Sequence, residues 1–436
     1  SKKQIEDAGE LPQDELAKKL DVRYMANGEL WRMGDMFQLS VELYDTKDKK
    51  VVWSDRWQEK WDNLTMVKGK LSDGLLKVFN MKPQIENNIV TTNPEAYEYY
   101  LKGRHKLLIP DSKEDIQLAI GLLNKAIALD EYLIDAKCAL AHTQPTMEKQ
   151  LDMIKSNIIE AKNLGKKNVL AKSYDSEGWT YWTLSQNELA MISFKKAIEI
   201  FEEINNKEGK MISLKGLGWV NKFIGQSENA FNLIFESIKI AKEIEDNNGL
   251  FYSYSELAVF YIFEDNYQDA IKSIENGNHY SNSSNHKGGI ALNCYAKGCI
   301  NLWEEDFKSS ANNFKISYEI FEILDDKTNI VWTHVWYILA CTMKGDIDVI
   351  DDLDLLHNRI AEGWLLDIDY PDVYFNLYKI YKALDDSDKA QSYLDLSYRK
   401  IITLSECIQE TKYKKSYFEM NYRKKIISEW ESYNKK

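Results

Sequence analysis

The feature that most constrains this chain is a spacing of 40 residues, which holds without insertion or deletion from residue 178 to residue 397. Small residues recur in one phase, with Ile350 as the single large member: Ala190, Ala230, Ala270, Ser310 and Ala390. Large apolar residues follow four places later: Phe194, Ile234, Ile274, Phe314 and Leu394. Small residues also precede the first set by twelve places: Gly178, Gly218, Ala258 and Gly298. Because a small residue on one helix admits a large side chain from the next, the spacing predicts a stack of interlocking helices.

Each period has the pattern of two amphipathic helices. The stretch NELAMISFKKAIEIFEEI, residues 187 to 204, places its apolar residues on one stripe and Glu and Lys opposite. Short polar breaks such as IGQSE and FEDN separate the two helices. The sequence therefore predicts a mainly α fold built from repeated helix pairs.

Three segments carry a family resemblance. AMISFKKA (190–197), AIKSIENG (270–277) and SANNFKIS (310–317) resemble the second helix of the tetratricopeptide repeat (TPR). An earlier unit, residues 93–130, looks like the same repeat, with Ala119, Leu123 and Ala126 in the equivalent positions. The resemblance implies a right-handed superhelical solenoid of about eight helix pairs over residues 93–408, with 40-residue repeats from about 168 and a capping helix within 409–436. The period is longer than usual, as in peptide-sensing regulators.

The same resemblance implies a concave groove lined by one face of the first helix of each pair. The residues expected to face it are large and mostly aromatic: Trp179, Trp182, Trp219, Phe223, Tyr252, Phe263, Trp303 and Trp332. Aromatic anchors dominate many peptide interfaces, so these residues form a candidate peptide-binding or protein-binding groove. The alternative is that the same rings pack between neighbouring repeats.

The front of the chain has a different pattern. Phe37, Leu39, Val41 and Leu43 alternate with more polar residues, which is typical of a strand with one buried face. Turn-like residues on either side predict an antiparallel meander with strands near 22–32, 36–45 and 51–59. Helices are expected at 14–20 and 64–78.

This stretch resembles the second half of the TolB-like domain that precedes TPRs in bacterial class III adenylate/guanylate cyclases and in some winged-helix regulators. The matching residues are LDVRYMANGEL, the Gly34-Asp35 turn, VELYD, and Trp53 followed by Asp55-Arg56. The resemblance implies a partial TolB-like α+β domain over residues 1–83 whose first strand and helix would lie upstream of Ser1. An incomplete sheet leaves an unpaired edge, which could pair with a second copy in a homodimer.

Composition narrows the class of partner. The formal net charge is −13 and no stretch has the length and hydrophobicity of a membrane span, so we expect neither nucleic acid nor membrane contact and a cytoplasmic location. Five scattered cysteines indicate free thiols in a reducing compartment. The Lys-rich end KYKKSYFEMNYRKK is expected to be the solvated face of a terminal helix.

No common catalytic or metal-binding motif is present. Cys138 and His142 stand four apart on a predicted helix but lack a third group that would orient the histidine. We therefore expect no enzyme activity in this chain and no cofactor. The leading hypothesis is a non-catalytic regulatory module of a cyclase-like signalling protein that binds a peptide or protein in its groove. The alternative is the ligand-sensing and oligomerisation region of a TPR-containing transcription regulator.

Overall fold

A computed structural model describes residues 15–16, 22–34, 36–60, 67, 71, 78, 93–108, 112–144, 146–281, 287–346, 349–365 and 370–434. The chain divides into two compact units. Residues 1–105 and 118–137 form the first, and residues 106–117 and 138–436 form the second. The predicted boundary between residues 83 and 93 falls mainly outside the described residues.

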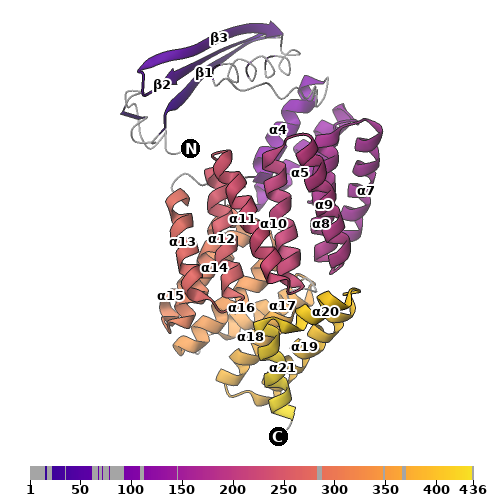
Figure 1. The fold of residues 1–436 in the computed structure, drawn as a ribbon, viewed down its shortest axis with the longest axis vertical. Coiled ribbons are helices and arrows are strands. Elements are labelled where there is room, and N and C mark those ends of the chain that lie inside the picture. Colours follow the sequence, from indigo (N-terminus) through magenta and orange to yellow (C-terminus); the bar gives the residue numbers. More distant parts are fainter. Residues whose placement is uncertain are drawn as a thin grey trace. The chain divides into compact units, whose positions relative to one another are not determined.

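The first unit contains a three-stranded antiparallel sheet in the order β1-β2-β3, which confirms the predicted meander (Figure 1). Its strands are β1 (Tyr24–Met33), β2 (Met36–Asp45) and β3 (Lys50–Lys60). The alternating apolar residues of β2 are buried on one face, where Phe37 and Val41 pack with Trp57 of β3 and with Val67. The predicted helix 14–20 lies almost entirely outside the described residues, and of helix 64–78 only residues 67, 71 and 78 are described, all helical.

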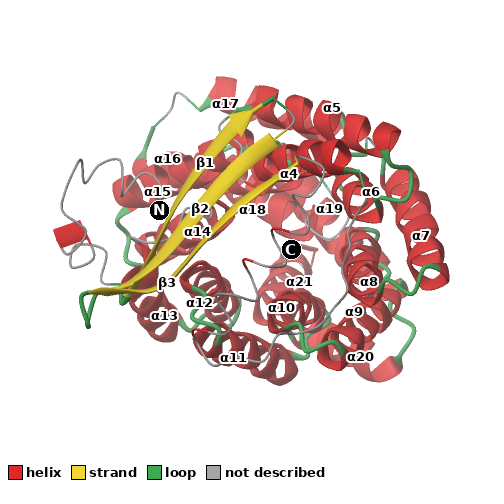
Figure 2. Ribbon diagram, turned by 90° about the horizontal axis from the view of Figure 1, so that it is seen from above, coloured by secondary structure: helices red, strands yellow, loops and turns green. Residues whose placement is uncertain are grey.

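The remaining elements are helices that follow one another in pairs. Their bounds are α4 (Pro94–Leu108), α5 (Lys113–Leu129), α6 (Ile134–Ala141), α7 (Met147–Asn163), α8 (Lys167–Thr183), α9 (Asn187–Glu203), α10 (Lys207–Phe223), α11 (Ser227–Glu243), α12 (Asn247–Ile262), α13 (Tyr267–Ser281), α14 (Lys287–Trp303), α15 (Phe307–Ile323), α16 (Lys327–Lys344), α17 (Ile350–Ala361), α18 (Tyr370–Ala383) and α19 (Ser387–Glu406). Figure 2 shows α10, α12 and α14 nearer the middle of the curved stack than α11, α13 and α15. We call the surface formed by the first helices of the pairs the inner face.

The 40-residue spacing has the predicted cause. A Cβ atom on Gly178 would lie 2.9 Å from the ring of Phe194, and one on Gly298 would lie 2.7 Å from the ring of Phe314. Both phenylalanines are fully buried. Each glycine on a first helix thus receives the large residue of the second helix sixteen places later, so the pair packs closely.

The turn inside each pair has a left-handed residue in a fixed phase, which ends the first helix. Its members are Ser185, Gly225, Asp265, Glu305, Gly345 and Asp385, with φ between 58° and 90°. Four of the six are not glycine, so φ alone does not require glycine at Gly225. A Cβ atom there would lie 2.1 Å from the carbonyl oxygen of Ser416, so the close approach of a distant segment does require it.

The single capping helix expected within 409–436 is instead two helices, α20 (Thr411–Glu419) and α21 (Asn421–Asn434). Met420 between them has an extended backbone, with φ −64° and ψ 133°. The break lets α20 and α21 follow different directions beneath α8 to α12 (Figure 1).

Candidate binding face inside the solenoid

Four of the predicted groove residues form one continuous row of aromatic rings on the inner face. Ring centroids lie 5.6 Å apart between Trp179 and Trp182, and 6.2 Å apart between Trp182 and Trp219. The row continues from Trp219 to Phe263 at 6.3 Å. All four side chains are partly buried and pack on the repeat cores, and their role in binding stays a prediction.

Buried charges lie beside this row, in a group we call the Trp219 cluster: Lys215, Trp219, Tyr252 and Glu256. The indole N–H of Trp219 donates to Oε1 of Glu256 at 2.6 Å, whereas Oε2 of Glu256 is buried with no hydrogen-bond partner among the described residues. The Lys215 ammonium lies 4.0 Å from the centre of the Tyr252 ring. Burial raises the pKa of Glu256 and lowers that of Lys215, while the opposite charge of each partner works against its shift.

A second group of charges lies on the inner face of α16 and α18, and we call it the Asp372 cluster: Trp332, Trp336, Asp372, Asn376 and Lys379. Oδ2 of Asp372 accepts the indole N–H of Trp332 at 3.0 Å and that of Trp336 at 3.1 Å. Lys379 donates to Oδ1 of Asn376 at 3.1 Å, and the Asn376 Nδ2 group is buried with no partner among the described residues. Burial raises the pKa of Asp372, and the nearby Lys379 opposes that rise.

The structure places the other predicted groove residues, and the Phe263 end of the row, in different surroundings. Phe223 lies 5.8 Å from the Tyr417 ring and Phe263 lies 6.4 Å from the Tyr422 ring, so α20 and α21 cover both. Trp332 is 8% exposed and packs on Tyr295. Trp303 is 49% exposed and stacks on Tyr267 at the edge of the solenoid.

The Lys-rich terminal segment is exposed at Lys412, Lys415, Lys424 and Lys425, as predicted, but not at Arg423. Arg423 is fully buried, with its guanidinium 3.4 Å from the centre of the Tyr417 ring. Lys425 forms an ion pair with Asp265 at 2.8 Å. Sequence pattern cannot separate Arg423 from the exposed Lys424 and Lys425, because its partner Phe223 lies 200 residues away along the chain.

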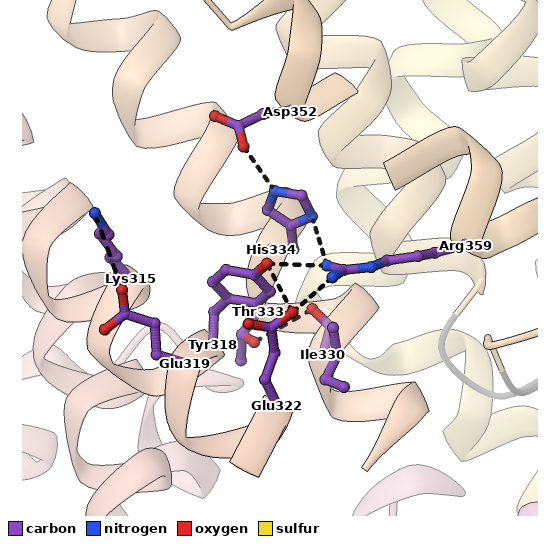
Figure 3. Close-up of polar contacts among 9 residues, drawn as sticks. All are labelled: Lys315, Tyr318, Glu319, Glu322, Ile330, Thr333, His334, Asp352 and Arg359. Carbon is purple, nitrogen blue, oxygen red and sulfur yellow. Dashed lines mark hydrogen bonds and ion pairs between the residues drawn. The ribbon is translucent and has the colours of Figure 1, made fainter. Parts of the chain in front are cut away.

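The opposite side of α16 carries a separate network, which we call the Arg359 network: Tyr318, Glu322, His334, Asp352 and Arg359 (Figure 3). Arg359 donates to Oε1 of Glu322 at 2.6 Å and to the Tyr318 hydroxyl at 3.1 Å. Its Nη1 lies 3.4 Å from Nδ1 of the fully buried His334, whose Nε2 lies 3.3 Å from Asp352. Since Arg359 can only donate, Nδ1 is the acceptor and the His334 proton is on Nε2.

The Cys138 and His142 side chains both contact serine hydroxyl groups of α8. Cys138 is buried against the Ser173 hydroxyl at 3.2 Å, and His142 contacts the Ser176 hydroxyl at 2.8 Å. Among described residues, no group of three or more His, Cys, Asp or Glu could hold a metal ion, and no described helix is long and apolar enough to cross a membrane. An open groove of about 630 Å³ lies over α11 to α13, lined by residues that include Phe235, Tyr254 and Lys242.

Sequence reasoning missed the charged members of both clusters. Lys215, Glu256, Asp372 and Lys379 occupy helix phases that hold apolar or small residues in several other repeats. A signal was present: Trp332 and Asp372 stand 40 residues apart, so they occupy the same phase on consecutive first helices and are expected to be neighbours.

Comparison with known proteins identifies the repeat. Residues 171–203, which span most of α8 and all of α9, match the model of the tetratricopeptide repeat. This chain contains a TPR. No curated protein matches it.

Solved TPR-like structures share the solenoid architecture. A Rap protein complexed with competence and sporulation factor aligns with a TM-score of 0.57 at 12% identity, covering 80% of this chain and 95% of the Rap chain. The Rap conjugation gene regulator of the plasmid pLS20, in complex with the Phr* peptide, aligns with a TM-score of 0.54 at 12% identity, covering 80% and 96%. At this identity the likeness establishes the fold, and the TPR solenoid prediction is confirmed.

Proposed function

We propose that the inner face of the TPR solenoid binds a peptide or a peptide segment of a protein, and that the chain acts as a regulatory module. The observation that carries this proposal is the aromatic row from Trp179 to Phe263 beside a buried carboxylate with one unused oxygen. A peptide offers apolar side chains for the rings and backbone N–H groups for that oxygen.

One hydrogen-bond acceptor, Oε2 of Glu256, and one donor, Nδ2 of Asn376, occupy the same position of the repeat. Glu256 and Asn376 are three periods of 40 residues apart, and each keeps a buried polar atom without a partner among the described residues. A buried polar atom without a hydrogen bond costs free energy, so a ligand that completes the bond gains affinity. Backbone amides of an extended peptide provide both the donor and the acceptor.

Two similar folds support the same class of ligand. The Rap protein and the pLS20 regulator are both described with a bound signalling factor or peptide, and this chain shares their solenoid fold. The chain's resemblance to the TolB-like domain extends the proposal to a parent that is a cyclase-like signalling protein, with a TPR-containing transcription regulator as the alternative. A cyclase domain or a winged helix encoded upstream would decide between them. Pairing of two copies through the β1 edge of the sheet is a further part of the proposal.

The test uses the full chain and a display library of short random peptides. We expect enriched peptides to bind Glu256→Gln about tenfold more weakly, because Gln keeps an acceptor for Trp219 but removes the unused carboxylate oxygen. The matched control is Glu319→Gln on the outer helix α15, where Glu319 is exposed and 3.9 Å from Lys315. Equal loss of binding in both variants, or no loss in either, would contradict the proposal.

A further inference from the structure

The C-terminal helices join two distant parts of the solenoid. We call α20 and α21 together the clasp. At one side, Trp430 of α21 donates to Asp395 of α19 at 2.6 Å and stacks on Tyr398 at 3.8 Å. At the other side, the clasp contacts the turns that follow α10 and α12. We call this second contact the turn surface: Phe223, Ile224, Gly225, Gln226, Phe263, Glu264 and Asp265.

The turn surface provides mainly acceptors and aromatic rings. The Ile224 carbonyl accepts the Ser416 hydroxyl at 2.8 Å, and the Glu264 carbonyl accepts the Asn421 amide at 3.2 Å. A carboxylate adds to this set, since Asp265 pairs with Lys425, whereas Gln226 is a donor, to the Ser416 hydroxyl at 2.7 Å. A ligand for this surface must therefore be rich in donors and positive charge.

Arg423 of the clasp is a cation bound at the turn surface by a carbonyl group and an aromatic ring. Its Nη1 donates to the Phe223 carbonyl at 2.8 Å, and its guanidinium lies 4.8 Å from the Phe223 ring. No carboxylate among the described residues forms an ion pair with it. Cation–π contacts and carbonyl groups offset only part of the cost of burying this charge.

Gly225 is the position where the fit is closest. The same phase holds Ser185 and Asp265 in the neighbouring repeats, so the turn itself tolerates a side chain. The backbone of Ser416 occupies the space that any Cβ on residue 225 would need. The turn surface is therefore shaped for a main chain to lie directly on it.

We propose that the turn surface is a binding site for a basic peptide segment with aromatic residues, and that the clasp is its resident competitor. This inference rests on the proposed function, because Phe223 and Phe263 belong to both surfaces, and it specifies the chemical class of the ligand. The ligand places aromatic side chains on these two rings, a cation at the Phe223 carbonyl and a second cation at Asp265. It binds when the clasp leaves.

The test compares two full-length variants that differ in where charge is placed on the clasp. Ser416→Glu with Lys425→Glu puts carboxylates against Ile224 and Asp265 and opens the clasp. Ser428→Glu with Lys424→Glu makes the same residue changes at exposed positions of α21 and leaves the clasp closed. The probe is a labelled synthetic peptide with the sequence of residues 411–434.

We expect the probe to bind the open variant at least about tenfold more tightly than the closed variant, because an intramolecular competitor acts at a high effective concentration. Adding Gly225→Ala to the open variant should abolish probe binding, whereas Gly345→Ala should not. Gly345 has the same turn phase and a φ of +90°, with nothing within 4 Å of its would-be Cβ. Circular dichroism checks that each variant folds, and Lys425→Ala, a milder opening, should give an intermediate affinity.

The outcomes separate this inference from the proposed function. If a charge-reversed probe, with Glu in place of Lys and Arg, binds the open variant and the native probe does not, the ligand class is wrong while inner-face binding stands. If the folded open variant binds neither probe, this inference fails, and the peptide library decides the proposed function separately. If labelled wild-type chains exchange clasps with one another and the free probe does not compete, the occupant is a second copy and the inference is overturned.

Discussion

The two sides of α16 carry polar groups of different kinds. On the outer side, the Arg359 network pairs its arginine with Glu322 and sets His334 between Asp352 and Arg359 (Figure 3). On the inner side, Asp372 accepts two indole N–H groups, and the nearby Asn376 Nδ2 group has no partner among the described residues. The outer network has opposite charges in direct contact, whereas the inner cluster does not.

This difference separates a structural network from a candidate site. The side chains of Glu322 and Asp352 are 33% and 38% exposed. Charges that are paired and also reach solvent need no ligand to complete their interactions. Buried groups with unused hydrogen-bonding capacity carry a cost that a ligand can remove. The same helix therefore carries paired charges on one side, and on the other side it lies beside the groups that we propose as a binding site.

The largest expected effect is on the inner side. Asp372→Ala leaves two buried indole N–H groups without an acceptor and Lys379 without its nearest carboxylate. We expect the free energy of unfolding to fall by about 3 kcal/mol, measured by urea denaturation. The outer comparison is Arg359→Met, for which we expect a smaller loss of about 1–2 kcal/mol because Glu322 can be rehydrated. An equal or greater loss for Arg359→Met would break the distinction between the two sides.

The next effect concerns the pH dependence of the outer network. Burial lowers the pKa of His334, and the positive charge of Arg359 adds to that shift while Asp352 and Glu322 oppose it. Tyr318 and Tyr337 are the other titratable groups against the imidazole. Because the unfolded chain then binds a proton more readily than the folded chain, the contribution of His334 to stability is complete above the unfolded pKa of about 6.5 and is lost as the pH falls below it.

The variant His334→Gln tests whether His334 makes the chain less stable as the pH falls. Glutamine keeps a donor for Asp352 and an acceptor for Arg359 but does not titrate. Between about pH 7.5 and about pH 5.5, the wild-type chain should lose more unfolding free energy than His334→Gln, since shifts from all other groups are common to both. His279→Gln, at an exposed position of α13, should follow the wild type. A wild-type profile parallel to that of His334→Gln would show that the network holds the histidine equally well in both protonation states.

The sequence predicted the parts of the molecule that repeat. Gly178 with Phe194 and Gly298 with Phe314 are the same contact in different periods, so the spacing alone located it. The alternation of β2 likewise located the buried face of the sheet. Repetition multiplies a weak local signal until it identifies the packing.

Features that occur once were not predictable in the same way. Asp372 and Glu256 are acidic residues that interrupt the pattern in one repeat each. Their hydrogen-bond partners, Trp332 and Trp219, lie about one period earlier on the preceding first helix, so only knowledge of how the first helices stack would predict these pairs. The clasp is harder still, because Ser416 meets Ile224 across 192 residues. The one sign of the clasp in the sequence is Gly225. The equivalent turn residues Ser185 and Asp265 show that the turn itself does not need glycine.

The smallest expected effect is at Trp303, the most exposed of the predicted groove residues. It stacks on Tyr267 with ring centroids 4.9 Å apart, and 49% of it remains exposed. Trp303→Ala should therefore lower the free energy of unfolding by less than about 0.5 kcal/mol, far below the effect of Asp372→Ala. The same variant should leave binding of library peptides unchanged, because the ring stands apart from the row between Trp179 and Phe263. If Trp303→Ala instead weakens peptide binding without changing stability, the binding face extends from the two clusters to the end of α14. Solvent exposure, rather than unused hydrogen-bonding capacity, would then identify the residues that bind the peptide.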